Sequence, residues 1–170
     1  MRSAAEARRL FWGVAAMLLV TDFVTKRLAE RALLPVPAVE VLGDWLQLRL
    51  VYNQGAAFGL HLGPWSRWIF LLVAIAAVVL LYRLARSSSA RDWFRQVSCG
   101  LVAGGAAGNL VDRVRSAQGV VDFIDVGIGA HRWPTFNVAD IGVSCGAIAL
   151  AISLWLEDAR RSRTNPAPSA

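Results

Sequence analysis

Three aspartates lie inside or at the end of long apolar runs of this sequence. They are Asp22, Asp112 and Asp140. A charged side chain at the centre of a membrane helix costs about 2.5–3.5 kcal/mol on insertion scales, so such residues are candidates for a functional role. Without a metal, a histidine or an activated serine, carboxylates can still carry out acid–base catalysis.

The spacing along the apolar runs places two of these carboxylates at a similar depth. Asp112 lies 16 residues after Gln96, and Asp140 lies 16 residues before Leu156. At 1.5 Å per residue, each is about 24 Å from one edge of a hydrocarbon core about 30 Å thick. Two adjacent carboxylates share a proton, so one can act as base and the other as acid. The spacing therefore predicts Asp112 and Asp140 as a pair suited to aspartic peptide hydrolysis.

These polar positions also have interpretations without peptide hydrolysis. Asp22 and Lys26 are four residues apart and can form a structural ion pair on one helix face. Asp112 and Arg113 can anchor the end of a short helix. A proton-coupled transporter subunit would also use buried carboxylates, but transporters place them near the midplane between repeated halves, and this sequence has no such repeat. A non-catalytic membrane scaffold is a third hypothesis.

Two further aspartates lie in the apolar, β-branched segment from Val120 to Ile128. Taken alone, Asp122 and Asp125 are interpreted as solvated acids of a loop. His61 and His131 lack metal-ligand spacing with either cysteine, so neither a metal nor another cofactor is expected.

Small residues are spaced to bring the third apolar run close to its neighbours. Gly100, Gly104 and Gly108 repeat every four residues, which gives a helix a flat stripe for close contact. Asn109 and Asp112 then point into the helix bundle rather than toward lipid.

The composition indicates a small membrane protein. Of the 170 residues 56% are hydrophobic and 18% are charged, against about 45–50% and about 25% in soluble proteins. We expect one domain covering residues 1–170, with a disordered tail from about 160 to 170. The net charge of +6 is distributed between apolar runs, which argues against a nucleic-acid partner. Four transmembrane helices are expected, at about residues 10–29, 63–82, 96–112 and 136–156.

The charge distribution predicts which way the helices point. An even number of spans places both termini on one side, where the segments carry 10 basic and 4 acidic residues, against 8 and 8 on the other side. The excess of positive charge predicts that both termini are cytoplasmic. Apolar and polar residues alternate from Leu46 to Leu50, and a turn signal follows at Asn53–Gly55. The predicted fold is an all-α membrane protein with a small extracytoplasmic β-containing segment between helices 1 and 2.

Five sequence blocks occur in order along the chain. They are Asp22-Phe23-Val24-Thr25-Lys26, Asn53-Gln54-Gly55-Ala56-Ala57-Phe58-Gly59, Gly104-Gly105-Ala106-Ala107-Gly108-Asn109-Leu110-Val111-Asp112-Arg113, Val120-Val121-Asp122-Phe123-Ile124 and Phe136-Asn137-Val138-Ala139-Asp140. Together they resemble the bacterial lipoprotein signal peptidases, or signal peptidase II, from roughly Leu10 to Leu156.

This resemblance implies an aspartic endopeptidase of the bacterial cytoplasmic (inner) membrane, with its active site near the extracytoplasmic face. It would remove the signal peptide from prolipoproteins by cutting before a cysteine that carries diacylglycerol. The expected partners are these diacylglyceryl-modified substrates and membrane lipid, with no nucleic acid, and the protein is expected to be a monomer.

The resemblance also assigns roles to individual residues. It implies that Asp122 and Asp140 are catalytic, which replaces the pair predicted from depth and the interpretation of Asp122 as a loop acid. No metal or cofactor is implied. The residues implied to bind substrate or to support the site are Asp22, Lys26, Asn53, Gly108, Asn109, Asp112, Arg113 and Asn137.

Overall fold

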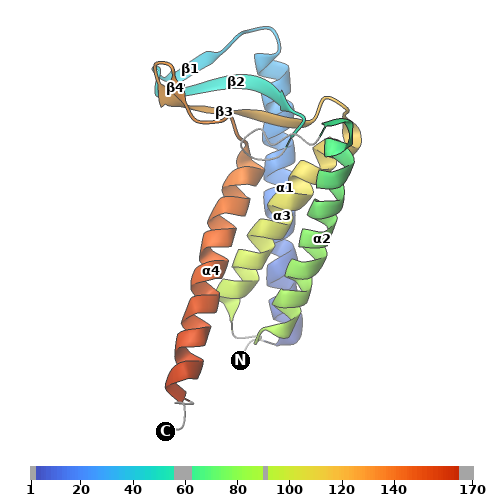
Figure 1. Cartoon of the computed structure of the whole chain (residues 1–170), viewed down its shortest axis with the longest axis vertical. Helices are drawn as coiled ribbons and strands as arrows, with labels where there is room; N and C mark the ends of the chain where they lie inside the picture. Colours follow the sequence, from blue (N-terminus) through green and yellow to red (C-terminus); the bar gives the residue numbers. More distant parts are fainter. Residues whose placement is uncertain (1–2, 56–62, 90–91, 165–170) are drawn as a thin grey trace.

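Four long helices run side by side in the computed structural model, which describes residues 3–55, 63–89 and 92–164 (Figure 1). Each covers most of one expected span, and its ends differ from the expected ends by two to eight residues. A short 3₁₀ turn, η2 (Gly63–Trp65), precedes the second helix. The helices are α1 (Ala4–Leu33), α2 (Ser66–Ser87), α3 (Trp93–Arg115) and α4 (Val138–Thr164).

The end of α4 corrects one expectation about the C-terminal tail. Disorder was expected from about residue 160, but α4 continues through Thr164. The apolar run ends at Leu156, and the helix continues for eight more residues through a charged segment. The rest of the expected tail, residues 165–170, lies outside the described residues.

Two of the helices described are long and apolar enough to cross a membrane. These are α2 and the Val138–Ala159 part of α4, with mean hydropathies of 2.4 and 1.8. Helices α1 and α3 are more polar because they carry charged and amide side chains on the faces that they turn toward each other. Asp22, Lys26 and Asp112 are buried there.

The small-residue stripe of α3 packs against α1, as its spacing predicts. A Cβ on Gly104 would lie 2.6 Å from the carbonyl oxygen of Ala15, and a Cβ on Gly100 would lie 2.8 Å from that of Phe11. Helix α3 also contacts α2 and α4, so it is the central helix of the bundle. Only residues without a side chain allow the backbones to approach this closely.

A four-stranded antiparallel sheet covers one end of the bundle (Figure 1). The strand expected at Leu46–Leu50 is part of β2. The expectation that the sheet lies between helices 1 and 2 is correct for only half of it, because β3 and β4 come from the connection between α3 and α4. The strand order is β1 (Val39–Leu42), β2 (Leu46–Asn53), β3 (Val120–Ile128) and β4 (His131–Arg132).

A sharp turn carries the chain from α3 into β3. Gly119 makes this turn with φ +109°, a conformation that side chains disfavour. A Cβ there would also collide with the backbone of Asn53 at the end of β2. Phe123 packs against Ala29 and Leu33 of α1, which fixes β3 to the helices. The turn and this contact place Asp122 over the start of α4.

Candidate active site

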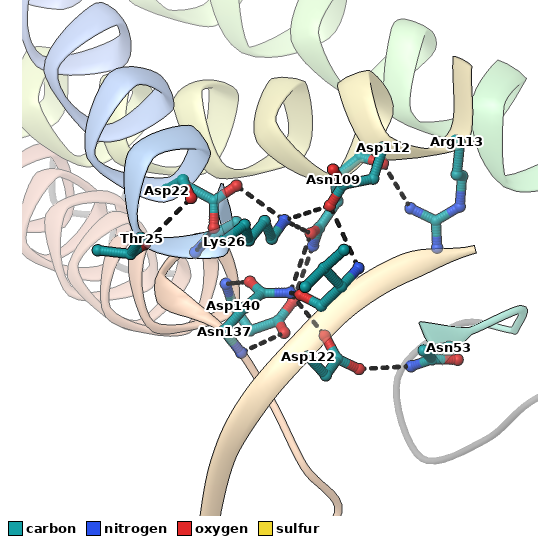
Figure 2. A network of polar contacts seen from close by, with 12 residues as sticks. Asp22, Thr25, Lys26, Asn53, Asn109, Asp112, Arg113, Asp122, Asn137 and Asp140 are labelled. Carbon is teal, nitrogen blue, oxygen red and sulfur yellow. Dashed lines mark hydrogen bonds and ion pairs between the residues drawn. The ribbon is translucent and has the colours of Figure 1, made fainter. Parts of the chain in front are cut away.

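Asp122 of β3 and Asp140 of α4 line the same cleft, whose volume is about 480 Å³. Asn137, just before α4, connects them (Figure 2). Its side-chain Nδ2 donates a hydrogen bond to Oδ1 of Asp122 at 2.7 Å, and its backbone N–H donates to Oδ2 of Asp140 at 3.1 Å. The structure therefore brings together the two aspartates that the resemblance implies, from segments 15 or more residues apart.

Asp122 is almost completely buried, at 2% exposure. Its other oxygen, Oδ2, accepts a hydrogen bond from Nδ2 of Asn53 at 3.0 Å. Burial, and then the nearby charge of Asp140, raise the pKa of Asp122 to about 7, although the amide donors and Lys26 act in the opposite direction. At neutral pH this carboxyl group therefore holds a proton for a large part of the time.

Asp140 is fixed in the first turn of α4 by a reciprocal pair of hydrogen bonds. The backbone N–H of Asp140 donates to Oδ1 of Asn137 at 3.0 Å, and the carboxylate of Asp140 accepts from the backbone of Asn137. This arrangement is the capping box of a helix N-terminus, with Asp in the third helical position. Nδ2 of Asn109 donates to Oδ1 of Asp140 at 2.8 Å.

Asp112 does not line the cleft with Asp140, so the pair predicted from depth is not the pair that the structure brings together. The Asp112 carboxylate faces the interior of the bundle, 2.8 Å from Nζ of Lys26. It also accepts a hydrogen bond from the backbone of Val121 at 3.3 Å. The depth estimate compared positions along the helices and took Asp122 for a loop acid, whereas β3 folds back and brings Asp122 to the cleft.

The expected pair of Asp22 and Lys26 is present, with Oδ2 and Nζ 2.8 Å apart. The other oxygen of Asp22 accepts a hydrogen bond from the backbone of Ala139 at 2.8 Å, so this carboxylate also holds the start of α4. A Cβ on Gly108 would lie 2.5 Å from Asp22, which explains why a residue without a side chain is needed there.

Arg113 lines the cleft and holds two backbone segments together. Its guanidinium donates to the carbonyl oxygens of Gly55 at 2.9 Å and Asn109 at 3.2 Å. It also lies 5.6 Å from the centre of the Phe70 ring. The rest of the sequence block that begins at Asn53, residues 56–59, lies outside the described residues.

Asp125 is not the solvated loop acid that its sequence context suggests. Its exposure is 1%, and it forms ion pairs with Arg49 at 3.3 Å and Arg132 at 3.0 Å. Asp125 lies three residues after Asp122 on β3 and is not among the residues that line the cleft. The sequence could not predict these ion pairs, because Arg49 of β2 and Arg132 of β4 come close to Asp125 only in the folded sheet.

The sequence did not predict that apolar side chains would form one wall of the cleft. Trp133, Phe136, Ile141 and Val143 line it next to the two aspartates. Their flanking position, on either side of the Asn137–Asp140 capping box, is the signal that could have identified them. In the described part of the chain, no group of three or more His, Cys, Asp or Glu side chains is arranged to hold a metal ion.

Comparison with known proteins now identifies the family. A family model described as signal peptidase (SPase) II matches residues 14–156. This chain belongs to the signal peptidase II family. The lipoprotein signal peptidase of Rhodococcus jostii is 43% identical over 152 residues, covering 86% of this chain and 73% of the relative. That of Treponema denticola is 38% identical over 161 residues, covering 88% and 91%.

Solved structures support the same family fold. Two are described as structures of bacterial membrane enzymes. One has a TM-score of 0.74 and 28% identity, covering 92% of this chain and 91% of the other. The second has a TM-score of 0.72 and 31% identity, covering 83% and 89%. These similarities support a membrane-embedded peptidase and give no support to the transporter hypothesis.

Proposed function

We propose that this member of the signal peptidase II family is a membrane aspartic endopeptidase acting on diacylglyceryl-modified prolipoproteins. It removes the signal peptide by cutting before the lipidated cysteine. One observation carries the proposal: the carboxyl groups of Asp122 and Asp140 line one cleft and accept hydrogen bonds from amide groups. This arrangement suits a pair that shares one proton, because no arginine or lysine is hydrogen-bonded to either group among the described contacts.

The raised pKa of Asp122 favours a starting state in which Asp122 holds the proton and acts as the acid, which leaves the role of base to Asp140. Asp140 takes a proton from a water molecule as the water oxygen attacks the scissile carbonyl carbon. Asp122 gives its proton to the carbonyl oxygen, which forms a neutral tetrahedral diol.

Collapse of this intermediate restores the enzyme. The proton on Asp140 passes to the leaving nitrogen as the carbon–nitrogen bond breaks. One hydroxyl group of the diol returns its proton to Asp122 as the new carboxyl group forms. The products are a signal peptide with a new C-terminal carboxyl group and a lipoprotein with a free amine on its lipidated cysteine.

Membrane placement follows from the same site. We propose that all four helices span the cytoplasmic membrane, with both termini in the cytoplasm and the sheet on the extracytoplasmic side. The polar faces of α1 and α3 are compatible with this, because Asp22, Lys26 and Asp112 are turned into the bundle. Both aspartates and their donors come from one chain of a single domain, residues 1–170, so a monomer is sufficient.

The apolar wall of the cleft supports a substrate with an apolar signal segment and a lipid anchor. Trp133, Phe136 and Ile141 offer apolar surface beside the two carboxyl groups. Each methylene group buried in the bilayer contributes about 0.8 kcal/mol. Diacylglycerol would therefore hold the scissile bond at the depth of the aspartates.

The test compares two substrates that differ only in diacylglycerol, using the purified full chain in lipid vesicles. We expect the modified prolipoprotein to be cut before its cysteine, and the unmodified one far more slowly. EDTA should leave the rate unchanged, since carboxyl groups and water suffice for this chemistry. Equal rates for the two substrates, or inhibition by EDTA that zinc reverses, would contradict the proposal.

A further inference from the structure

Lys26 has a role beyond its ion pair with Asp22. Its exposure is 1%, and its ammonium group forms ion pairs with Asp22 Oδ2 and Asp112 Oδ2, both at 2.8 Å. It also donates a hydrogen bond to Oδ1 of Asn109 at 2.8 Å. An ammonium group has three hydrogens and accepts no hydrogen bond. The group that Asn109 turns toward Lys26 must therefore be its carbonyl oxygen.

The contact with Lys26 determines which end of the Asn109 side-chain amide faces the cleft. The side-chain amide is planar, so a carbonyl oxygen that faces Lys26 leaves the NH₂ group facing Asp140, where Nδ2 and Oδ1 are 2.8 Å apart. The two ends of an amide have nearly the same shape and differ mainly in hydrogen bonding. A flipped Asn109 would place NH₂ against the ammonium group and a carbonyl oxygen against the carboxylate, and both contacts are repulsive.

The second amide of the network depends on the same orientation. Nδ2 of Asn137 donates to Oδ1 of Asn109 at 3.2 Å as well as to Asp122. Figure 2 shows this chain of contacts from Lys26 through Asn109 and Asn137 to the two aspartates. A flip of Asn109 would turn its NH₂ group toward that of Asn137, so the direction of every donor in the chain follows from Lys26.

We infer that Lys26 is a positioning residue: by fixing the orientation of the Asn109 amide, it keeps the NH₂ group of that amide on Asp140, the base of the proposed reaction. A hydrogen bond donated to a carboxylate favours its charged form. The inference rests on the proposed function, because it assigns the base and the acid of that reaction. Lys26 itself touches neither aspartate of the pair and acts through Asn109.

The other charged groups around Lys26 do not replace this role. Asp22 of α1 and Asp112 of α3 offset its charge, and Asp122 of β3 and Asp140 of α4 lie beyond the amides. Arg113 of α3 donates to backbone oxygens, including that of Asn109, and leaves the side-chain amide free to flip. Among the described contacts, Lys26 is the charged group that discriminates between the two orientations.

The test compares Asp22→Asn with Asp22→Asn/Lys26→Met in the full chain. The double variant removes one buried charge of each sign, so it leaves no extra uncompensated charge, and Asn at position 22 can still accept from Ala139. We expect kcat of the double variant to fall about 10–100-fold below that of the single variant, with KM within about twofold. Asp22→Asn alone is the reference for this comparison, and its own loss of kcat should be smaller than that of the double variant.

The pH profile separates positioning from a merely structural role. The positive charge of Lys26 lowers the pKa of Asp122, so the double variant should lose activity at a higher pH than the single variant. Equal kcat in the two variants, or a double variant with an unchanged pH profile, would overturn the inference.

A second pair of variants covers the case in which the double variant does not fold. Lys26→Arg keeps a group that only donates, whereas Lys26→Gln has a carbonyl oxygen and allows either orientation of Asn109. We expect a higher kcat for Lys26→Arg than for Lys26→Gln, and equal values would overturn the inference. A failure of the proposed function gives a different result, because the enzyme without substitutions would then not cut the lipid-modified substrate.

Discussion

The two halves of β3 hold buried carboxylates in contrasting surroundings. We call residues 120–123 the inner half of β3 and residues 124–128 its outer half. Asp125 in the outer half pairs with two arginines, Arg49 and Arg132. Asp122 in the inner half has similar burial, but its hydrogen-bond donors are the amides of Asn53 and Asn137. The residue type, the strand and the burial are the same, so the difference lies in the partners.

This difference separates a structural carboxylate from a reactive one. A guanidinium group beside a buried carboxylate stabilises its charge, and the pair then serves to hold strands together. Amide donors solvate a carboxylate without a full opposite charge. Burial and the neighbouring Asp140 can therefore raise the pKa of Asp122 to about 7, where it can both give and accept a proton.

The largest expected effect is the loss of either carboxyl group of the cleft. Asp122→Asn and Asp140→Asn should each lower kcat by about 10²–10⁴-fold, because one group cannot act as both acid and base. The measurement is the rate of cleavage of a lipid-modified prolipoprotein per folded enzyme.

Asp125→Asn is the matched control, since it makes the same change on the same strand at similar burial. We expect its kcat to stay within about threefold of the original enzyme, although its melting temperature should fall. Near-normal turnover by Asp122→Asn, or a loss of turnover by Asp125→Asn as large as that of Asp122→Asn, would remove the distinction between the two halves.

The next largest effect concerns the donor to Asp122. Asn137→Ala removes both the side-chain donor and the cap of α4, and Asn137→Ser restores an N-cap oxygen without the amide NH₂. We expect kcat to fall about 10–100-fold in both variants. Thermal unfolding should show that Ser recovers stability relative to Ala. If Asn137→Ser restores kcat as well, then capping of α4, and not the donor to Asp122, is what the site requires.

The elements of the fold were predicted from the sequence because their signals are local. Long apolar runs located the helices, and the alternation from Leu46 to Leu50 located part of β2. Strand β1 was not predicted; it is only four residues long, and all four are exposed. The burial of Asp125 was missed because its partners Arg49 and Arg132 become neighbours only when the sheet forms.

The site was predicted less completely, since it depends on how the chain folds back. The spacing of Asp112 and Asp140 indicated a carboxylate at the position that is now the first turn of α4. The spacing could not show that Asp112 forms an ion pair with Lys26. Nor could it show that the chain turns at Gly119 and places Asp122 in the cleft. The resemblance supplied Asp122, and the structure supplies the contacts that make this assignment physically reasonable.

A smaller effect is expected from pH. The folded pKa of Asp122 is raised, so the proton that it must donate is present below pH about 7 and is lost as the pH rises through this value. Above it, kcat should fall about tenfold for each pH unit, which makes pH 8 roughly tenfold slower than the plateau. The measurement is a pH–rate profile in vesicles, with Asp125→Asn as a control that should keep the same alkaline limb. A flat profile between pH 6 and 9 would contradict the protonated state assigned to Asp122.

The smallest effect is expected at the outer end of β3. Arg49 is 47% exposed on its side chain, so its ion pair with Asp125 is screened by water, and Arg132 remains as a second partner. Arg49→Gln should therefore lower the free energy of unfolding by about 0–1 kcal/mol, and high salt should reduce even this difference. Melting temperatures in low and high salt measure it, and Arg132→Gln, which loses the more buried partner, should cost more stability. Because the outer half of β3 holds its charges in place by pairing them, neither substitution should move the alkaline limb of the pH–rate profile. A shift of that limb in Arg49→Gln would mean that Asp122 senses the charges around Asp125, and that the two halves of β3 form one electrostatic unit.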